Sequence, residues 1–125
     1  MIDHVGLNAR DLAAAKAFYA EALEPLGYRI FAEWEEHVGF QAGDGGPDFW
    51  VSRRGDPAGT GTHVCFRARD RETVLAFHTA ALAAGGTDNG PPGLRPHYHE
   101  HYYGAYVLDP DGNNVEAVCH APVPA

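Results

Sequence analysis

Two stretches of the sequence, HVGLNARD at residues 4–11 and HVCFRARD at residues 63–70, are identical at five of eight positions. The offset of 59 residues between them continues without a gap, so that Phe18 pairs with Phe77 and Gly27 with Gly86. A register this long indicates that one structural unit occurs twice in the chain. The sequence therefore predicts a duplicated fold.

Each copy begins with an alternating apolar pattern that is typical of a strand with one buried face: Val5 and Leu7, then Val64 and Phe66. A helix is expected after each strand, since Asp11 and Asp70 can accept the free amide hydrogens of a first helical turn. Apolar residues then recur at helical spacing. Further strands are predicted at residues 29–35, 37–42 and 48–53 in the first copy, and at residues 104–108 and 114–120 in the second.

The predicted fold class is α+β. Two β-α-β-β-β modules are expected to form a curved, incompletely closed mixed sheet, with a metal cleft inside and the helices outside. With 125 residues the chain is long enough for one compact domain. Within this single domain, 1–125, we expect module one at residues 1–54, a linker at residues 55–62 and module two at residues 63–120.

Composition excludes several classes of partner. The chain has 9 basic and 17 acidic residues and a formal net charge of -8, so its field repels nucleic acids and anionic membranes. We also expect a cytoplasmic location, because the start lacks a signal-peptide pattern and no segment approaches the roughly 20 apolar residues that span a bilayer. Neither Cys65 nor Cys119 belongs to a CxxC pair, so both are expected to be reduced thiols rather than disulfide or zinc ligands.

Alternation also predicts which polar side chains share a face. His4 and His63 each precede an inward-facing valine, so both histidines are expected on the face away from the helices. Glu116 joins them if Val115 and Ala117 pack toward the helix. Taken singly, each of the three is more often a hydrogen-bonded residue than a metal ligand. The equivalent positions of the histidines, and the cost of burying a carboxylate without a cation, favour a shared metal site.

Three segments resemble the vicinal-oxygen-chelate superfamily: IDHVGLNARDL at residues 2–12, THVCFRA at residues 62–68 and DPDGNNVEAV at residues 109–118. This superfamily includes glyoxalase I, extradiol dioxygenases, fosfomycin-resistance proteins and bleomycin-binding proteins. The resemblance covers nearly the whole chain. It implies that His4, His63 and Glu116 bind one divalent metal ion, which is Fe, Zn, Ni, Mn or Co.

The chain departs from the glyoxalase pattern at the last strand of module one, which reads GPDFWVSR at residues 46–53. The pattern has a fourth ligand here. When the turns before the two last strands are aligned, Phe49 falls opposite Glu116, and Asp48 reaches that position only after a one-residue slip. Three protein ligands suit non-haem Fe(II), and the missing carboxylate removes the base that a glyoxalase reaction would use.

The resemblance also suggests residues around the metal. Similar proteins carry a histidine and a YYG sequence before the next-to-last strand, which implies that His99 and Tyr103 are catalytic. Trp50, Arg67 and Tyr102 are predicted to bind the substrate.

Residues 87–102 have no clear period and are expected to form an irregular strand or a lid. Within this segment His97, His99 and His101 alternate. On an extended strand they would share a face and could form a second metal site. An exposed or lid segment that is rich in aromatic residues is the preferred interpretation.

The leading functional hypothesis is a metal-dependent enzyme, either a lyase or isomerase or a dioxygenase, whose small substrate chelates the metal through two adjacent oxygens. The alternative is a resistance protein that binds a drug or metabolite without catalysis, although such relatives lack the ligand set. A thiol transferase of the fosfomycin-resistance kind is a third hypothesis, for which no distinctive loop is found. A homodimer is expected, because an open curved sheet leaves edges to cover.

Overall fold

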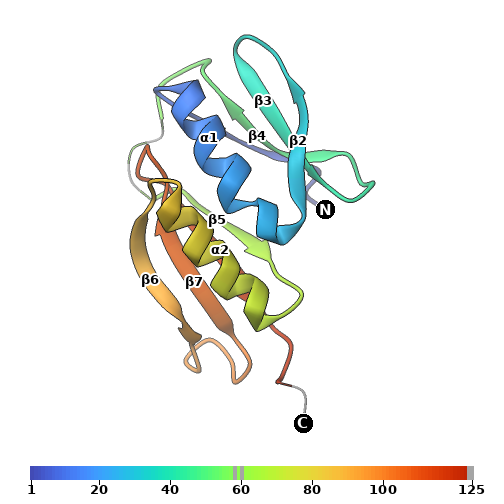
Figure 1. The fold of residues 1–125 in the computed structure, drawn as a ribbon, viewed down its shortest axis with the longest axis vertical. Coiled ribbons are helices and arrows are strands. Elements are labelled where there is room, and N and C mark those ends of the chain that lie inside the picture. Colours follow the sequence, from blue (N-terminus) through green and yellow to red (C-terminus); the bar gives the residue numbers. More distant parts are fainter. Residues whose placement is uncertain (58, 60, 124–125) are drawn as a thin grey trace.

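The computed structural model describes residues 1–57, 59 and 61–123, and it contains two modules of the same connectivity (Figure 1). Module one consists of β1 (Val5–Asn8), α1 (Leu12–Ala22), the short 3-10 helix η1 (Glu24–Leu26), β2 (Tyr28–Glu33), β3 (His37–Ala42) and β4 (Pro47–Ser52). Module two consists of β5 (His63–Arg67), α2 (Arg71–Ala83), β6 (Thr87–Leu94), β7 (Tyr103–Leu108) and β8 (Asn114–Cys119).

The strands form two four-stranded mixed sheets of matching topology. Their orders are β1-β4-β3-β2 and β5-β8-β7-β6. In each sheet the first strand pairs with the last one in parallel, and the other pairs are antiparallel. The predicted α+β fold of two β-α-β-β-β modules is confirmed, and the sheets are not closed into a barrel.

Both helices lie in front of the sheets in Figure 1 and contact each other. Their N-caps are the predicted ones: Asp11 accepts a hydrogen bond from the backbone of Ala14, and Asp70 accepts one from the backbone of Thr73. In α1 the buried residues recur at helical spacing: Ala15, Phe18, Tyr19 and Ala22. This spacing turns one stripe of each helix toward the sheets.

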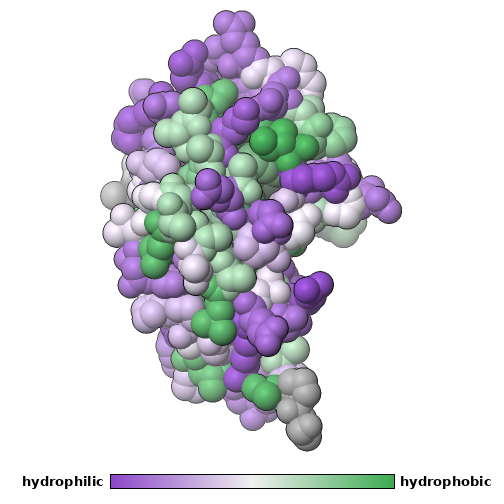
Figure 2. Space-filling model, in the orientation of Figure 1, coloured by the Kyte–Doolittle hydropathy of each residue, from purple (hydrophilic) through white to green (hydrophobic). Residues whose placement is uncertain are grey.

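One hydrophobic core runs through both modules. Aromatic rings connect them: the centroid of Phe66 in β5 lies 5.3 Å from that of Phe49 in β4 and 5.4 Å from that of Tyr28 in β2. A close approach also joins α1 to the start of β6, because a Cβ atom at Gly86 would come within 2.7 Å of the Phe18 ring. On the helix-bearing surface, Figure 2 shows hydrophobic residues in separate patches among hydrophilic ones.

The DPDGN turn between β7 and β8 fixes one module against the other. The hydroxyl of Tyr19 in α1 donates a hydrogen bond of 2.5 Å to Oδ2 of the buried Asp109. Asp109 also accepts bonds from the backbone of Asp111 at 2.9 Å and from the backbone and side chain of Asn113 at 2.8 Å each. Burial, with the charge of Asp109 second, raises the pKa of the Tyr19 hydroxyl, which therefore stays a donor.

The segment without a clear period divides into two parts. Residues 87–94 form the edge strand β6, whose pairing with β7 has two register shifts. Residues 95–102 form a mostly exposed turn segment. This segment, which contains His97, His99 and His101, is therefore not an extended strand. The hypothesis of a second metal site, which needed such a strand, is wrong. The preferred interpretation, an exposed aromatic-rich segment, agrees with the structure.

The predicted linker, residues 55–62, falls between β4 and β5, and its residues 58 and 60 lie outside the described part. Among the helices that the structure describes, none is both long and apolar enough to cross a membrane.

Tyr19→Phe should lower the free energy of unfolding by about 1–3 kcal/mol, because a buried carboxylate then loses one of its hydrogen bonds. Urea denaturation would measure the change. Tyr98→Phe is the matched control, since Tyr98 is 59% exposed and its change should stay within about 0.5 kcal/mol. Equal effects of the two substitutions would contradict the role of the Tyr19 hydroxyl.

Candidate functional site

The face of module two that points away from the helices carries a buried carboxylate. Glu116 is 1% exposed, and its neighbours on β8, Val115 and Ala117, belong to the core on the other face. On β5 the core residue is Phe66, so His63 and Cys65 share the face of Glu116. The predicted facing of His63 and Glu116 is therefore what the structure shows.

Both oxygens of Glu116 have polar partners. His63 Nε2 lies 2.8 Å from Oε1, and the Tyr102 hydroxyl donates a short hydrogen bond to Oε2. Cys65 and Tyr106 are its partners on the adjacent strands. Gly104 allows this packing, because a Cβ atom there would stand 3.1 Å from Glu116 Oε2. The carboxylate thus sits inside a cage of an imidazole, two phenols and a thiol.

This cage keeps its hydroxyl and thiol groups protonated. Desolvation, followed by the hydrogen bond to Glu116, raises the pKa of Tyr102. Desolvation is also the main cause that raises the pKa of Tyr106 to about 12. The pKa of the Cys65 thiol is raised by desolvation first and by the negative charge of Glu116 second. Near neutral pH all three groups are donors and none is a nucleophile.

Module one has an aromatic residue where module two has this carboxylate. In β1 and β4, Gly6 pairs with Trp50, as Cys65 pairs with Glu116 in β5 and β8. The prediction that Phe49 lies opposite Glu116 is therefore wrong by one residue, and Phe49 points into the core. The cause is an irregularity in the β3–β4 pairing next to Phe40, where one extra residue shifts the register.

The six-membered ring of the Trp50 indole lies over Gly39 of strand β3. A Cβ atom at Gly39 would stand 2.6 Å from the Trp50 ring, so the absence of a side chain makes room for the indole. Trp34 stacks beside it, with ring centroids 5.8 Å apart and an angle of 28° between the planes. The His37 ring lies 4.9 Å from Trp34 and 5.6 Å from Trp50. We call these three rings the aromatic platform.

Two hollows border these features, and His4 lines both. The first, of about 370 Å³, is also lined by His63, Cys65 and Arg67. The second, of about 310 Å³, is also lined by Trp50. The His4 side chain is 57% exposed, and its Nδ1 lies 2.6 Å from an oxygen of Asp3.

The donor set at Glu116 suits a divalent metal ion in part. One imidazole nitrogen and one carboxylate oxygen are ligands of such ions, and no lysine or arginine in the described part of the chain is paired with the buried Glu116. Across residues 1–57, 59 and 61–123, however, no three His, Cys, Asp or Glu side chains are grouped closely enough to hold a metal. His63 and Glu116 are two of the three predicted ligands, and His4 lines the same hollow as His63 without forming a metal-binding group with the pair.

The two residues predicted to be catalytic do not reach Glu116. His99 is exposed, and its Nε2 lies 2.7 Å from Nδ1 of His120. Tyr103 pairs with the buried Cys119 and packs against the core, with the Arg71 guanidinium 5.0 Å above its ring. Tyr103 therefore faces the helix side of the sheet, and its predicted catalytic role is not supported by this position. Strand alternation determines this facing.

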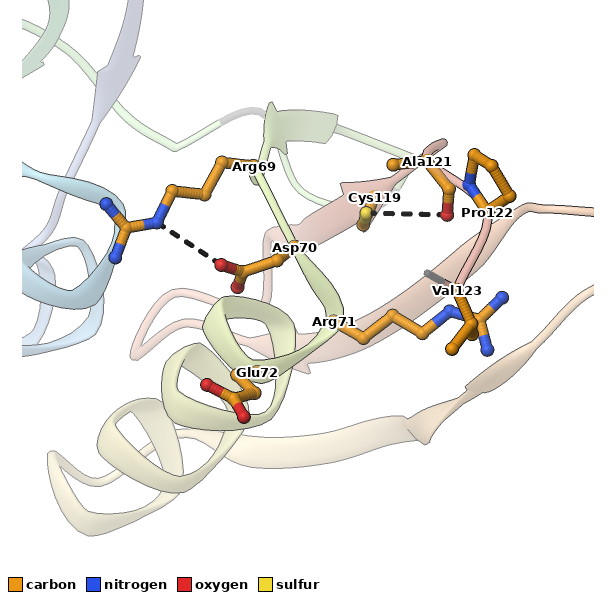
Figure 3. Close-up of a pocket in the computed structure, with 8 residues that line it drawn as sticks. All are labelled: Arg69, Asp70, Arg71, Glu72, Cys119, Ala121, Pro122 and Val123. Carbon is orange, nitrogen blue, oxygen red and sulfur yellow. Dashed lines mark hydrogen bonds and ion pairs between the residues drawn. The ribbon is translucent and has the colours of Figure 1, made fainter. Parts of the chain in front are cut away.

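A further pocket of about 370 Å³ lies at the N-terminal end of α2 (Figure 3). It is lined by Arg71, Cys119 and residues that follow β8, on the far side of β8 from Glu116. Its Asp70 carboxylate is already used as the helix cap. The pocket contains none of the predicted metal ligands and is not the candidate site.

The chain is similar to known proteins over nearly its full length. A family model described as the Glyoxalase/Bleomycin resistance protein/Dioxygenase superfamily matches residues 1–117. The chain belongs to this superfamily. No curated protein matches it by sequence.

Solved structures agree with this membership. A glyoxalase/bleomycin resistance protein from Albidiferax ferrireducens T118 is 33% identical, with a TM-score of 0.78 and coverage of 95% of this chain and 97% of that one. A lactoylglutathione lyase from Agrobacterium tumefaciens is 26% identical, with a TM-score of 0.68 and coverage of 93% and 90%. A superfamily enzyme from Burkholderia phytofirmans PsJN is 20% identical, with a TM-score of 0.75 and coverage of 96% and 98%, and shows the fold alone.

Sequence reasoning did not find Tyr106, His37 or Arg54. Tyr106 faces Glu116 because the antiparallel register pairs them, and this register is not visible in the sequence of one strand. Alternation along residues 37–42 would have placed His37 with Gly39 on one face. Arg54 follows β4 and lines the second hollow.

The raised pKa of Cys65 predicts slow alkylation. In chelator-treated protein at pH 8.5, iodoacetamide should modify Cys65 at least about tenfold more slowly than in the urea-unfolded chain, because the thiolate is the reacting form. Glu116→Gln removes a negative charge and should accelerate the reaction. Peptide mass spectrometry would follow Cys65, with the buried Cys119 as an internal reference. Equal rates in the folded and unfolded chain would contradict the cage.

Proposed function

We propose that the protein is a metal-dependent enzyme of this superfamily that acts on a small substrate with two adjacent oxygen atoms. The observation that carries the proposal is Glu116, a carboxylate buried to 1% exposure in the middle of a strand and 2.8 Å from a histidine nitrogen. Burial of this charge costs free energy that a bound cation would offset. No lysine or arginine among the described residues is paired with Glu116 to offset that cost already.

His63, Glu116 and His4 would hold the ion. Bound there, it would supply charge stabilisation on chelating oxygens or oxygen activation. Tyr102 donates a hydrogen bond to Glu116 Oε2, so Oε1, beside His63 Nε2, would be the oxygen that binds the ion. Arg67 lines the same hollow with an exposed side chain and is positioned to bind an anionic part of the substrate.

His99 acts indirectly in this proposal. Its ring meets the Tyr102 ring edge-on at 5.6 Å and is tied to His120 at the end of β8. It therefore positions Tyr102 rather than contacting the substrate. In module one, Trp50 occupies the position equivalent to Glu116, so this module offers no second carboxylate there. A glyoxalase reaction would use such a carboxylate as a base, and its replacement by tryptophan favours oxygen activation.

The alternative is a protein that binds a drug or metabolite without catalysis. The aromatic platform supports it, since exposed rings on a concave face are typical of ligand binding. Metal content distinguishes the two functions, because the binding protein of this alternative needs no metal ion.

Glu116→Gln should lower metal affinity by at least about tenfold while keeping the side chain's size, because it removes the anionic ligand. Protein purified without chelator or nickel resin would be analysed by inductively coupled plasma mass spectrometry. Asp48→Asn is the control, since the Asp48 carboxylate accepts a hydrogen bond from Tyr28 instead. Full metal content in Glu116→Gln together with loss in Asp48→Asn would overturn the ligand set.

We further propose that a homodimer completes the site. The strands β1 and β5, beside the two histidines, are edge strands of their sheets, and open edges invite pairing. One copy's His4 would then join the pair of His63 and Glu116 on the other.

Two other expectations also stay proposals. They are the division of the chain into module one at residues 1–54, a linker at residues 55–62 and module two at residues 63–120, and the cytoplasmic location.

Mixing two inactive variants tests the shared site. If the site is shared, a mixed dimer of His4→Gln and Glu116→Gln chains carries one intact ligand set, and metal content should recover to about half of one ion per chain. Light scattering would establish the dimer, and differently tagged chains would allow its isolation. Recovery of no metal in the mixed dimer would assign the site to a single chain.

A further inference from the structure

We infer that the aromatic platform, with Arg54 at its rim, binds a planar aromatic ring that carries a carboxylate. The inference concerns the second hollow, of about 310 Å³, which Trp50, His37 and Arg54 line together. This volume is at the lower end of small-molecule pockets, about 300–1,000 Å³. The claim that this ring is part of the enzyme's substrate rests on the function proposed above. The claim that a ring binds at this hollow does not rest on it.

The platform is built rather than accidental. The bare backbone of Gly39 seats the Trp50 indole, and even one added carbon would stand 2.6 Å from the ring. Trp34 continues the aromatic surface and is 55% exposed. Exposing so much of an indole forfeits the free energy of burying it, which a ligand face stacked on the platform would recover.

The two modules differ at the equivalent positions of their third and fourth strands. At equivalent positions, module two pairs Tyr106 with Glu116 and module one pairs Gly39 with Trp50. In module two the large side chain, Tyr106, is on the third strand and the acid is on the fourth. In module one the third strand has a glycine, and the fourth has the large Trp50 in place of the acid. One half of the duplicated fold thus retains groups that bind a cation, and the other half presents a ring surface.

The positive charge of Arg54 favours a ligand that carries a carboxylate. Arg54 is exposed, its Nη2 lies 3.3 Å from His37 Nδ1, and none of the ion pairs in the described part of the chain includes it. The adjacent Arg53 is different, because Glu36 already pairs with it at 3.3 Å. In a chain with a net charge of -8, a free guanidinium beside stacked rings is a specific attraction for an aromatic carboxylate.

The two tryptophans are the only ones in the chain, so they report on the platform directly. Their two indole N–H signals would be recorded by 1H–15N NMR and assigned with Trp34→Phe. Titration with 2-naphthoate should shift the Trp50 signal in a saturable way. Cyclohexanecarboxylate, which has the charge without a planar ring, should cause no saturable shift. 2-Naphthalenemethanol, the same ring without the charge, should bind about tenfold more weakly.

Substitutions of two neighbouring arginines distinguish a specific contact with the Arg54 guanidinium from a general effect of positive charge. Arg54→Gln should weaken 2-naphthoate binding about tenfold and leave 2-naphthalenemethanol unchanged. Arg53→Gln is the matched control and should leave both affinities unchanged. Gly39→Ala should displace the indole and weaken both ligands. Glu116→Gln should lose metal but still bind 2-naphthoate.

Each contrary outcome overturns the inference. These outcomes are no saturable shift of Trp50, equal binding of cyclohexanecarboxylate, or equal effects of the Arg53 and Arg54 substitutions. A Trp50 signal that responds to protein dilution instead of 2-naphthoate would assign the face to a second copy. If the protein bound metal but not 2-naphthoate, only this inference would be contradicted. If it bound 2-naphthoate but no metal, only the proposed enzyme function would be contradicted.

Discussion

A strand that packs one face against a helix can present only every second residue on its other face, and the candidate site depends on this constraint. Val115 and Ala117 belong to the core, so Glu116 must point away from it. His63 reaches the same face because Phe66 on its strand packs inward. The buried carboxylate and the histidine therefore meet as a consequence of core packing, and any shift of one residue would separate them.

The duplication places equivalent positions in equivalent surroundings, but the two modules no longer use them alike. Module two surrounds Glu116 with groups that hold protons, among them Tyr102 and Cys65. Module one has exchanged the acid for the Trp50 indole on a glycine seat. A cleft formed from both surfaces would combine charge chemistry on one side with ring recognition on the other, which suits a small polar substrate with a planar part.

The DPDGNNVEAV segment combines structure and chemistry within ten residues. Its first aspartate, Asp109, is buried and holds the turn together while it accepts the Tyr19 hydroxyl from the other module. Its glutamate, Glu116, lies seven residues further along, on the face away from the core. The turn thus fixes the start of β8, and with it the position along the strand at which Glu116 lies beside His63. A motif that resembles a ligand signature is therefore also an interface between the modules.

The sequence by itself determined the repeat, the helix caps at Asp11 and Asp70 and the shared face of His63 and Glu116, because alternation and capping depend on neighbouring residues. The position of Trp50 was decided by tertiary structure. One extra residue in the β3–β4 pairing reverses the facing of the residues beyond it, and no local pattern reveals such an irregularity. That His4 lines the same hollow as His63 but does not complete a three-residue metal group with Glu116 was also decided by the tertiary structure. It depends on how the two sheets pack around a common core and not on the order of residues within either sheet.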